Sequence, residues 1–241
     1  MIRSRVRFAL ESVEAVIVTV ATVLTWPVSK RWLRNWGALA GERDRDWLGD
    51  ALVSESHSSY TRAISVEAAP EDVWPWLVQF GLGKAGFYSY ELLERIAGIP
   101  VRNVESIVPR FQTLSVGDEV RLHPKAPGIP VAILGEGRHI CFGDLGEEPQ
   151  HANPEPKRSW SMYLEPGDGH QTRLILRGCI ESPPNPSLAR RLGGMLEEPV
   201  DFIMEQRMLR TLKRLASGAK TAPTIDGGSR VGNTPRPERR V

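Results

Sequence analysis

Residues 61–94 read TRAISVEAAPEDVWPWLVQFGLGKAGFYSYELLE, and this stretch decides the fold. Within it GLGKAG, at 81–86, has the G-x-G-x-x-G spacing of a dinucleotide-binding turn. Such a turn follows a strand and opens a helix. Here residues 61–68 alternate as a strand does, but the next segment reads as a helix, because Pro70 suits a first helical turn and the acidic pair after it favours the positive end. The glycines therefore follow a helix, which argues against a nucleotide site.

We interpret GLGKAG instead as a corner between two helices. Gly81 would end the first helix, and Gly83 and Gly86 would let the chain turn sharply. The second helix is expected over 88–98, where leucine and isoleucine share one face and Gly98 provides a stop.

Strand-like runs follow the second helix, at 119–124, 129–137, 139–145, 158–166 and 171–182. Glycine and proline signals and an acidic stretch at 144–157 separate them, and PGDG at 166–169 is typical of a hairpin turn. A long helix is expected over 188–217, because apolar residues recur there at three-and-four spacing. The order predicts an α+β fold with an antiparallel sheet.

An apolar run near the N-terminus, AVIVTVATVLTWPV at 15–28, contains 14 residues without a charge. A membrane-spanning helix needs about 20 residues, and extension back to Phe8 includes Glu11 and Glu14. Three interpretations stay open: a short membrane anchor with a tryptophan belt, a helix that lies at an interface or packs on the domain, and a signal peptide.

Composition divides the chain into three parts. Residues 1–35 form a hydrophobic, basic helical segment outside the domain, 36–217 form the domain, and 218–241 form a basic tail that is expected to be disordered. Residues 29–60 show no clear period and are interpreted as a linker and lead-in. The ends are basic and the middle is acidic although the net charge is +2, which argues against nucleic-acid binding.

Cysteine and histidine indicate no metal site and no cofactor. The two cysteines, Cys141 and Cys179, form no C-x-x-C pair and are best read as small buried residues. The five histidines lack the close spacing of metal ligands.

Several segments together resemble bacterial members of the SRPBCC superfamily (START-like, polyketide-cyclase and ligand-binding proteins). They are TRAISVEAAPEDVWPWLVQFG, GFYSYELLERIAG, VGDEVRL, SWSMYLEP with TRLILR, and LEEPVDFIMEQRMLRTLKR. The resemblance covers about residues 36–217. It implies a helix-grip fold, in which a curved antiparallel sheet wraps around a long C-terminal helix and encloses a cavity for a hydrophobic small molecule or lipid.

Strand alternation then predicts which side chains face that cavity. In the last strand the face with Arg173 and Arg177 is expected outside, and the aliphatic face is expected to point at the long helix. The residues expected to line the cavity are Ile140, Phe142, Trp160, Met162, Leu174, Leu176, Met204 and Met208. A methionine-rich and aromatic lining suits an adaptable apolar pocket, although the same residues could fill a closed core.

Three polar side chains complete the expected ligand-binding set: Tyr88 and Tyr90 near the cavity mouth, and Arg207 on the long helix. Glu198 lies with Arg207 on the long helix and is considered beside it, and Arg62 and Gln79 are weaker candidates. We find no Ser/His/Asp set, no paired carboxylates at a defined spacing and no phosphate loop, so no catalytic residue is assigned.

Three functions are consistent with the sequence. The first is binding, with or without transfer, of a hydrophobic small molecule or lipid by a cytoplasmic protein that touches the membrane through residues 8–28. The second is a cyclase or aromatase acting on a polyketide-like chain, in which Tyr88, Tyr90 or Arg207 would polarise carbonyls. The third is an interaction module with a closed core.

Overall fold

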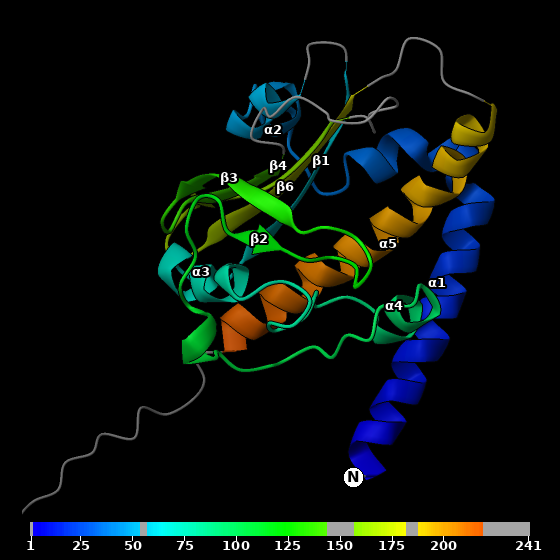
Figure 1. The fold of residues 1–241 in the computed structure, drawn as a ribbon, viewed down its shortest axis with the longest axis horizontal. Coiled ribbons are helices and arrows are strands. Elements are labelled where there is room, and N and C mark those ends of the chain that lie inside the picture. The colour runs from blue at the N-terminus through cyan, green and yellow to red at the C-terminus, as the bar shows by residue number, and fades with distance from the viewer. Residues whose placement is uncertain (1, 54–56, 144–156, 182–187, 219–241) are drawn as a thin grey trace, which may run out of the picture.

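The computed structural model describes residues 2–53, 57–143, 157–181 and 188–218, with side chains from residue 6 onward and, in the last helix, from residue 197. Of the acidic separator expected at 144–157, residues 144–156 lie outside the described residues, and so do residues 219–241 of the tail expected from 218. The fold is α+β: one antiparallel sheet curves over a long C-terminal helix, as expected (Figure 1).

The sheet has six strands in the order β1-β6-β5-β4-β3-β2. They are β1 (His57–Val66), β2 (Glu119–Val120), β3 (Ile129–Gly135), β4 (His139–Gly143), β5 (Arg158–Pro166) and β6 (Thr172–Glu181). The expected hairpin joins β5 to β6, and β1 closes the other edge of β6. The run at 119–124 forms only two residues of strand, and β1 begins four residues before the predicted start.

The longest helix of the domain is α5 (Leu188–Gly218), which packs across the concave face of the sheet. Its Met208, Leu209 and Leu212 are buried against Ile140, Met162, Leu174 and Leu176 in the main core. Alternation therefore predicted correctly which face of β4, β5 and β6 points at α5, because successive side chains of a strand point to opposite faces and the main core lies on the α5 side.

The glycine motif is a loop, as predicted. Helix α3 (Pro70–Val78) precedes it and α4 (Glu91–Ile96) follows it, shorter than the predicted 88–98. Gly81, Gly83 and Gly86 have φ values of 127°, 81° and 90°, a region that favours glycine. Gly81 pairs with Gly86 across the loop, and an added Cβ at Gly86 would meet the Arg102 carbonyl oxygen at 2.8 Å.

The segment after the N-terminal helix is structured, so its interpretation as a linker was wrong. Helix α2 (Ala40–Asp44) and the 3-10 turn η1 (Leu48–Leu52) cover the convex face of the sheet; a second 3-10 turn, η2, spans Pro109–Phe111. The expected exposed face of β6 is consequently buried: Arg177 pairs with Asp50 at 2.9 Å and Arg173 pairs with Glu42 at 2.6 Å. These elements are short, and a periodicity argument needs longer ones.

Helix α1 (Ile2–Arg34) runs along α5 on the side away from the sheet (Figure 1). Its Ala15 and Leu33 are buried together with Phe202 and Ile203 of α5. The helix predicted over the first 35 residues is present, and it is packed on the domain along one side.

Candidate functional site

A pocket of about 430 Å³ lies between the sheet and α5. Phe80, Phe87 and Phe142 line one end together with Trp160, whose ring centroid lies 5.2 Å from that of Phe80 and 5.5 Å from that of Phe142. Aliphatic side chains of α4, of the loops at Ile99 and Leu122, of Ile129 at the start of β3, and of α5 complete the apolar wall. The space therefore suits an apolar group of the size of a small organic ligand.

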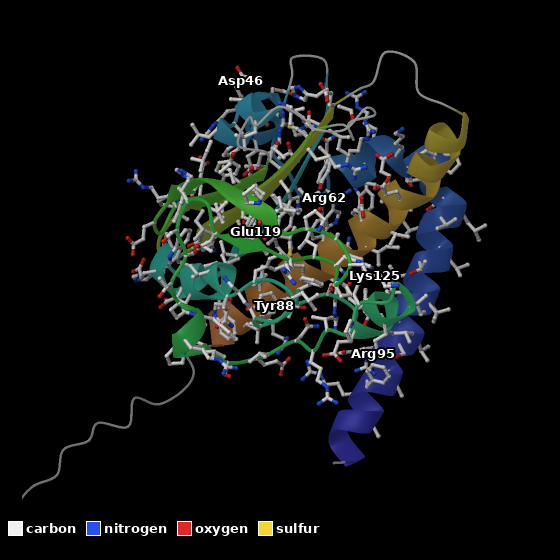
Figure 2. The ribbon with its side chains drawn as sticks, in the orientation of Figure 1. Asp46, Arg62, Tyr88, Arg95, Glu119 and Lys125 are labelled. Carbon is white, nitrogen blue, oxygen red and sulfur yellow. The ribbon has the colours of Figure 1, made fainter. Side chains whose placement is uncertain are left out.

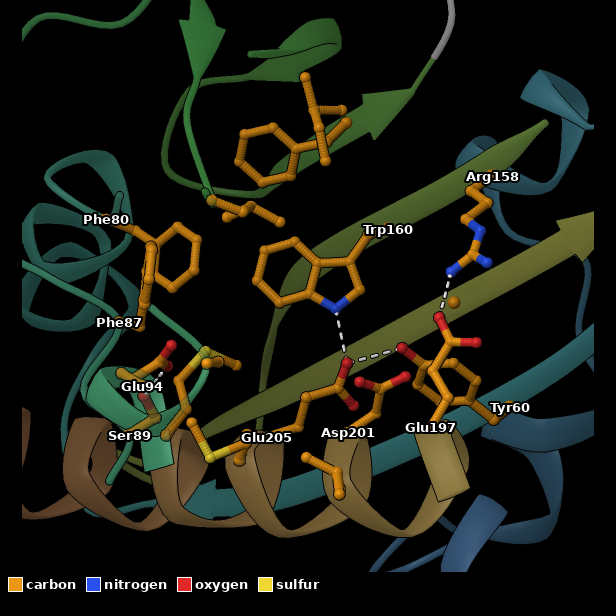
Figure 3. A pocket seen from close by; sticks show the side chains of 18 of the residues that line it. Tyr60, Phe80, Phe87, Ser89, Glu94, Arg158, Trp160, Glu197, Asp201 and Glu205 are labelled. Atoms are coloured by element: carbon orange, nitrogen blue, oxygen red, sulfur yellow. Dashed lines mark hydrogen bonds and ion pairs between the residues drawn. The ribbon is translucent and has the colours of Figure 1, made fainter. Parts of the chain in front are cut away.

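The other end of the pocket is acidic, and Glu205 is its centre (Figure 3). The Tyr60 hydroxyl donates to Glu205 Oε1 at 2.6 Å, and the Trp160 indole N–H donates to the same oxygen at 2.9 Å. Glu205 Oε2 accepts an ion-paired hydrogen bond from Arg62. Three donors therefore hold one carboxylate in a fixed place at the boundary between the pocket and the core.

Arg62 stands behind this carboxylate and not in the pocket. Its side chain is 1% exposed, its Nε donates to the Leu33 carbonyl at 3.1 Å, and its guanidinium lies over the Tyr60 and Phe202 rings. The Leu33 oxygen belongs to α1, so Arg62 connects the first helix with the acidic end of the pocket. Figure 2 shows Arg62 in the interior.

Tyr60 reaches Glu205 because its strand neighbour is a glycine. In the register of β1 and β6, Tyr60 faces Gly178, and an added Cβ at Gly178 would lie 2.3 Å from the Tyr60 ring. The ring therefore lies flat across the neighbouring strand, a space that any side chain at 178 would occupy. Burial raises the pKa of Tyr60 well above its usual value, and Glu205 adds to that shift, so the hydroxyl keeps its proton.

Asp201 lies one turn before Glu205 and lines the same pocket. Its side chain makes no hydrogen bond or ion pair with any residue in the described part of the chain. Asp201 is exposed on its open side, but the protein atoms around its carboxyl group and the neighbouring carboxylates of Glu205 and Glu197 together raise its pKa to about 7. Glu197 is itself paired with Arg158 at 2.9 Å. Asp201 is thus the carboxyl group most available to a ligand.

A second protonatable carboxyl, Glu94, lines the pocket on the α4 side. It accepts a hydrogen bond from the Ser89 hydroxyl at 2.6 Å. Burial raises its pKa and the Ser89 bond only partly opposes that rise. The pocket therefore presents carboxyl groups from two elements; Arg158, which lines it, and Arg62, which lies behind it, are both already paired.

Four of the eleven side chains expected to bind a ligand line this pocket: Phe142, Trp160, Met204 and Met208. Four others are fully buried in the core beneath it and are absent from its lining: Ile140, Met162, Leu174 and Leu176. The alternation that placed these four on the inward face is right, but the core fills the space next to them.

The three polar candidates do not line this pocket. The Tyr88 hydroxyl donates to the Trp76 carbonyl at 3.1 Å and accepts from Gln79 at 2.9 Å, so it fastens α3 to the glycine loop. The Tyr90 hydroxyl donates to Glu14 of α1 at 2.9 Å. Arg207 pairs with Glu11 at 2.9 Å. Both residues hold α1 against the domain, and ligand contact by any of the three stays a prediction.

The acidic end is the part of the site that the sequence analysis missed. No paired carboxylates were expected from the sequence, yet Asp201 and Glu205 are four residues apart and share one face of the helix. That signal was readable in the sequence. The role of Tyr60 was not, because it depends on the register of β1 with β6.

No family model and no curated protein matches this chain. Among solved structures, a protein from Arthrobacter aurescens has a TM-score of 0.37 at 16% identity, covering 76% of this chain and 95% of its own. The Zhui aromatase/cyclase from Streptomyces sp. R1128 has a TM-score of 0.31 at 12% identity, covering 69% of this chain and 97% of its own. Ara h 8.0201 has a TM-score of 0.36 at 11% identity, covering 66% of this chain and 97% of its own. At these TM-scores and identities the likeness assigns neither a family nor a function, and the description of the fold rests on the structure itself.

Proposed function

We propose that this chain is an SRPBCC-type helix-grip protein that binds a hydrophobic small molecule or lipid between the sheet and α5. The observation that carries the proposal is the pocket of about 430 Å³, apolar at one end and acidic at the other. Its volume falls in the range of small-molecule sites. A pocket of this size also weighs against the third possibility, an interaction module with a closed core.

The acidic end favours a ligand with a hydroxyl or amine group over one with a carboxylate. Glu205 is already saturated by Tyr60, Trp160 and Arg62, so its oxygens repel a second anion. Asp201 has no partner among the described residues, and it can accept a hydrogen bond when ionised or donate one when protonated. A long-chain alcohol or amine therefore suits the site better than a fatty acid.

Asp201 also gives the cyclase alternative a specific basis. A carboxyl group with a pKa near 7 beside an apolar wall can donate a proton to a carbonyl oxygen, or remove one from carbon, at neutral pH. In that reading Asp201 would carry the reaction, in place of the predicted Tyr88, Tyr90 or Arg207. The binding function remains our first proposal, because it needs only the pocket.

The test is displacement of the neutral dye Nile red from the full-length protein by matched C12 alcohol, amine and fatty acid. We expect the alcohol and amine to compete better than the acid. Met204→Trp should fill the pocket and abolish dye binding, and Ile96→Trp adds the same ring at a position that is 73% exposed and should leave it intact. Dye binding that survives Met204→Trp would refute the site.

Turnover separates binding from the cyclase alternative. Native and denaturing mass spectra of the purified protein would identify any retained compound, which would then be incubated with fresh protein. A compound returned unchanged supports binding, and conversion that is lost in Asp201→Asn supports the enzyme.

A further inference from the structure

Helix α1 turns its charged side chains toward the domain. Arg7 pairs with Glu105 at 2.6 Å, and Glu11 and Glu14 pair with Arg207 at 2.9 and 3.6 Å. At the other end Arg34 and Lys30 pair with Glu198. Near the N-terminal end the Arg95 guanidinium of α4 also lies over the Phe8 ring (Figure 2). Polar contacts therefore fasten α1 to the domain near both of its ends.

The opposite side of α1 is apolar and exposed. Leu24 is 75% exposed and Val28 is 90% exposed. The exposed large apolar residues of this face are Val6, Leu10, Val13, Val16, Ile17, Val20, Leu24 and Val28. Their spacing of three and four residues places them in one continuous stripe, which is about 33 Å long at 1.5 Å per residue.

This arrangement is the reverse of a helix on the surface of a water-soluble domain, which turns its apolar stripe to the core and its charges to water. An exposed apolar patch of this extent marks a surface that another apolar phase covers. The segment Val6–Arg34 is also long and apolar enough to cross a membrane by length and composition, since its most apolar 18-residue window has a mean hydropathy of 1.7. Hydrocarbon is therefore the covering phase that matches this face.

The ion pairs decide between lying on a membrane and crossing it. Because α1 runs antiparallel to α5, with Arg7 near one end and Arg34 near the other, an α1 that crossed the membrane while docked would carry Arg207, with Glu11 and Glu14, into hydrocarbon. Charges at that depth are strongly unfavourable. With α1 in the membrane plane, the same charges stay on the water side and only the apolar stripe enters the lipid.

A second copy of the chain is the other candidate for covering the stripe. Specific protein interfaces have a polar rim that sets the register of the partners. Here the stripe contains no charged or hydrogen-bonding residue from position 6 to position 28, while Trp32, 59% exposed, and the exposed Arg31 stand at its C-terminal end. Aromatic and basic residues at that position suit the headgroup region of a bilayer.

We propose that α1 is an in-plane membrane anchor. It is docked on α5 through its charged side, and its apolar stripe is inserted at the boundary between the headgroups and acyl chains of the leaflet that the protein faces. Helix α1 then lies between the pocket and the lipid. Leu93 and Met204 line the pocket and also pack against the cluster that holds α1.

The test uses the full-length protein and phosphatidylcholine vesicles in a flotation assay. We expect the protein to float with the vesicles at low and at high salt, because the contact is apolar. Ile17→Glu and Leu24→Glu should weaken partitioning by tenfold or more each, since each removes a large apolar side chain from the lipid. Thr25→Glu, which adds the same charge beside the stripe at an exposed position, is the matched control and should float like the parent.

Depth measurement distinguishes the two membrane geometries. The native cysteines are buried, so a fluorophore can be attached to single cysteines introduced as Leu10→Cys, Ile17→Cys and Leu24→Cys. An in-plane helix predicts equal, shallow quenching by lipids brominated at different depths. A deep maximum at position 17 would show a spanning helix and overturn the proposal. Failure to float, with dimerisation that Leu24→Glu abolishes, would overturn it in favour of a second copy.

Discussion

Replacing Glu205 by methionine should destabilise the protein strongly, because Arg62 would remain charged inside the core. The Arg62 side chain is 1% exposed, and without Glu205 it would keep, among the described residues, only its hydrogen bond to the Leu33 carbonyl. Leaving one member of a buried ion pair costs about 3–5 kcal/mol in the free energy of unfolding. We expect a loss of that size in urea unfolding of the full-length protein, monitored by tryptophan fluorescence. The slope of the unfolding free energy against urea concentration should stay unchanged.

The same substitution at an exposed pair is the control. Glu197→Met on the same helix breaks a pair whose side chains are 51% and 48% exposed, so the expected loss is below about 1 kcal/mol. The double variant Arg62→Met with Glu205→Met removes both charges and should recover most of the loss, because no unpaired charge is left. A Glu205→Met protein within about 0.5 kcal/mol of the parent would refute the reasoning.

Three further changes test other parts of the site. Gly178→Ala should cost about 1–3 kcal/mol in unfolding free energy, because its Cβ would lie 2.3 Å from the Tyr60 ring. Asp201→Asn should stabilise the protein above pH 7 by about 1 kcal/mol and should match the parent near pH 4, as measured by urea unfolding across pH. The reason is that the pKa of Asp201 is higher in the folded than in the unfolded protein, so the parent loses stability as the pH rises from about 4 to 7. Solvent in the open pocket limits the size of the effect. Asp50→Asn should show the opposite trend. Burial raises the pKa of Asp50, but hydrogen bonds from Arg177 and its neighbours outweigh that and lower it, so the parent's advantage exists above the unfolded pKa and disappears as acid unfolding scans fall below about pH 4.

The fold could be predicted from the sequence because its signals are long and periodic. Residues 158–166 and 171–182 alternate with period two, and α5 repeats every three to four residues over its whole length. The glycine loop was also readable, since a helix and not a strand precedes Gly81. In these segments local pattern and tertiary packing favour the same structure.

The cover of the convex face could not be predicted in the same way. Helix α2 and turn η1 contain five residues each, which is too short to show a period. Their positions depend on single long-range contacts, such as the pairs of Arg173 with Glu42 and Arg177 with Asp50. A charge on a strand was read as exposed, and the sequence alone could not show that its partner lies 127 residues away.

The site was half predicted for a related reason. Alternation identifies the inward face of a sheet, but whether an inward side chain meets a helix or an empty space depends on how far the helix stands from each strand. Leu176 meets the buried part of α5, while Trp160 on the next strand opens into the pocket. Only the three-dimensional packing separates these two residues.

Helix α5 connects the two proposals, because one of its sides lines the pocket and the other packs against α1. One side presents Met204, Glu205 and Met208 to the pocket, and the other packs Phe202 and Ile203 against α1. Arg62 touches both systems through Glu205 and the Leu33 carbonyl. If α1 left α5 to cross the bilayer, Arg62 would lose one partner and the acidic end of the pocket would rearrange. A docked, in-plane α1 therefore predicts that dye affinity in the pocket is the same for free and vesicle-bound protein, and an affinity that changes on vesicle binding would show that the helix undocks.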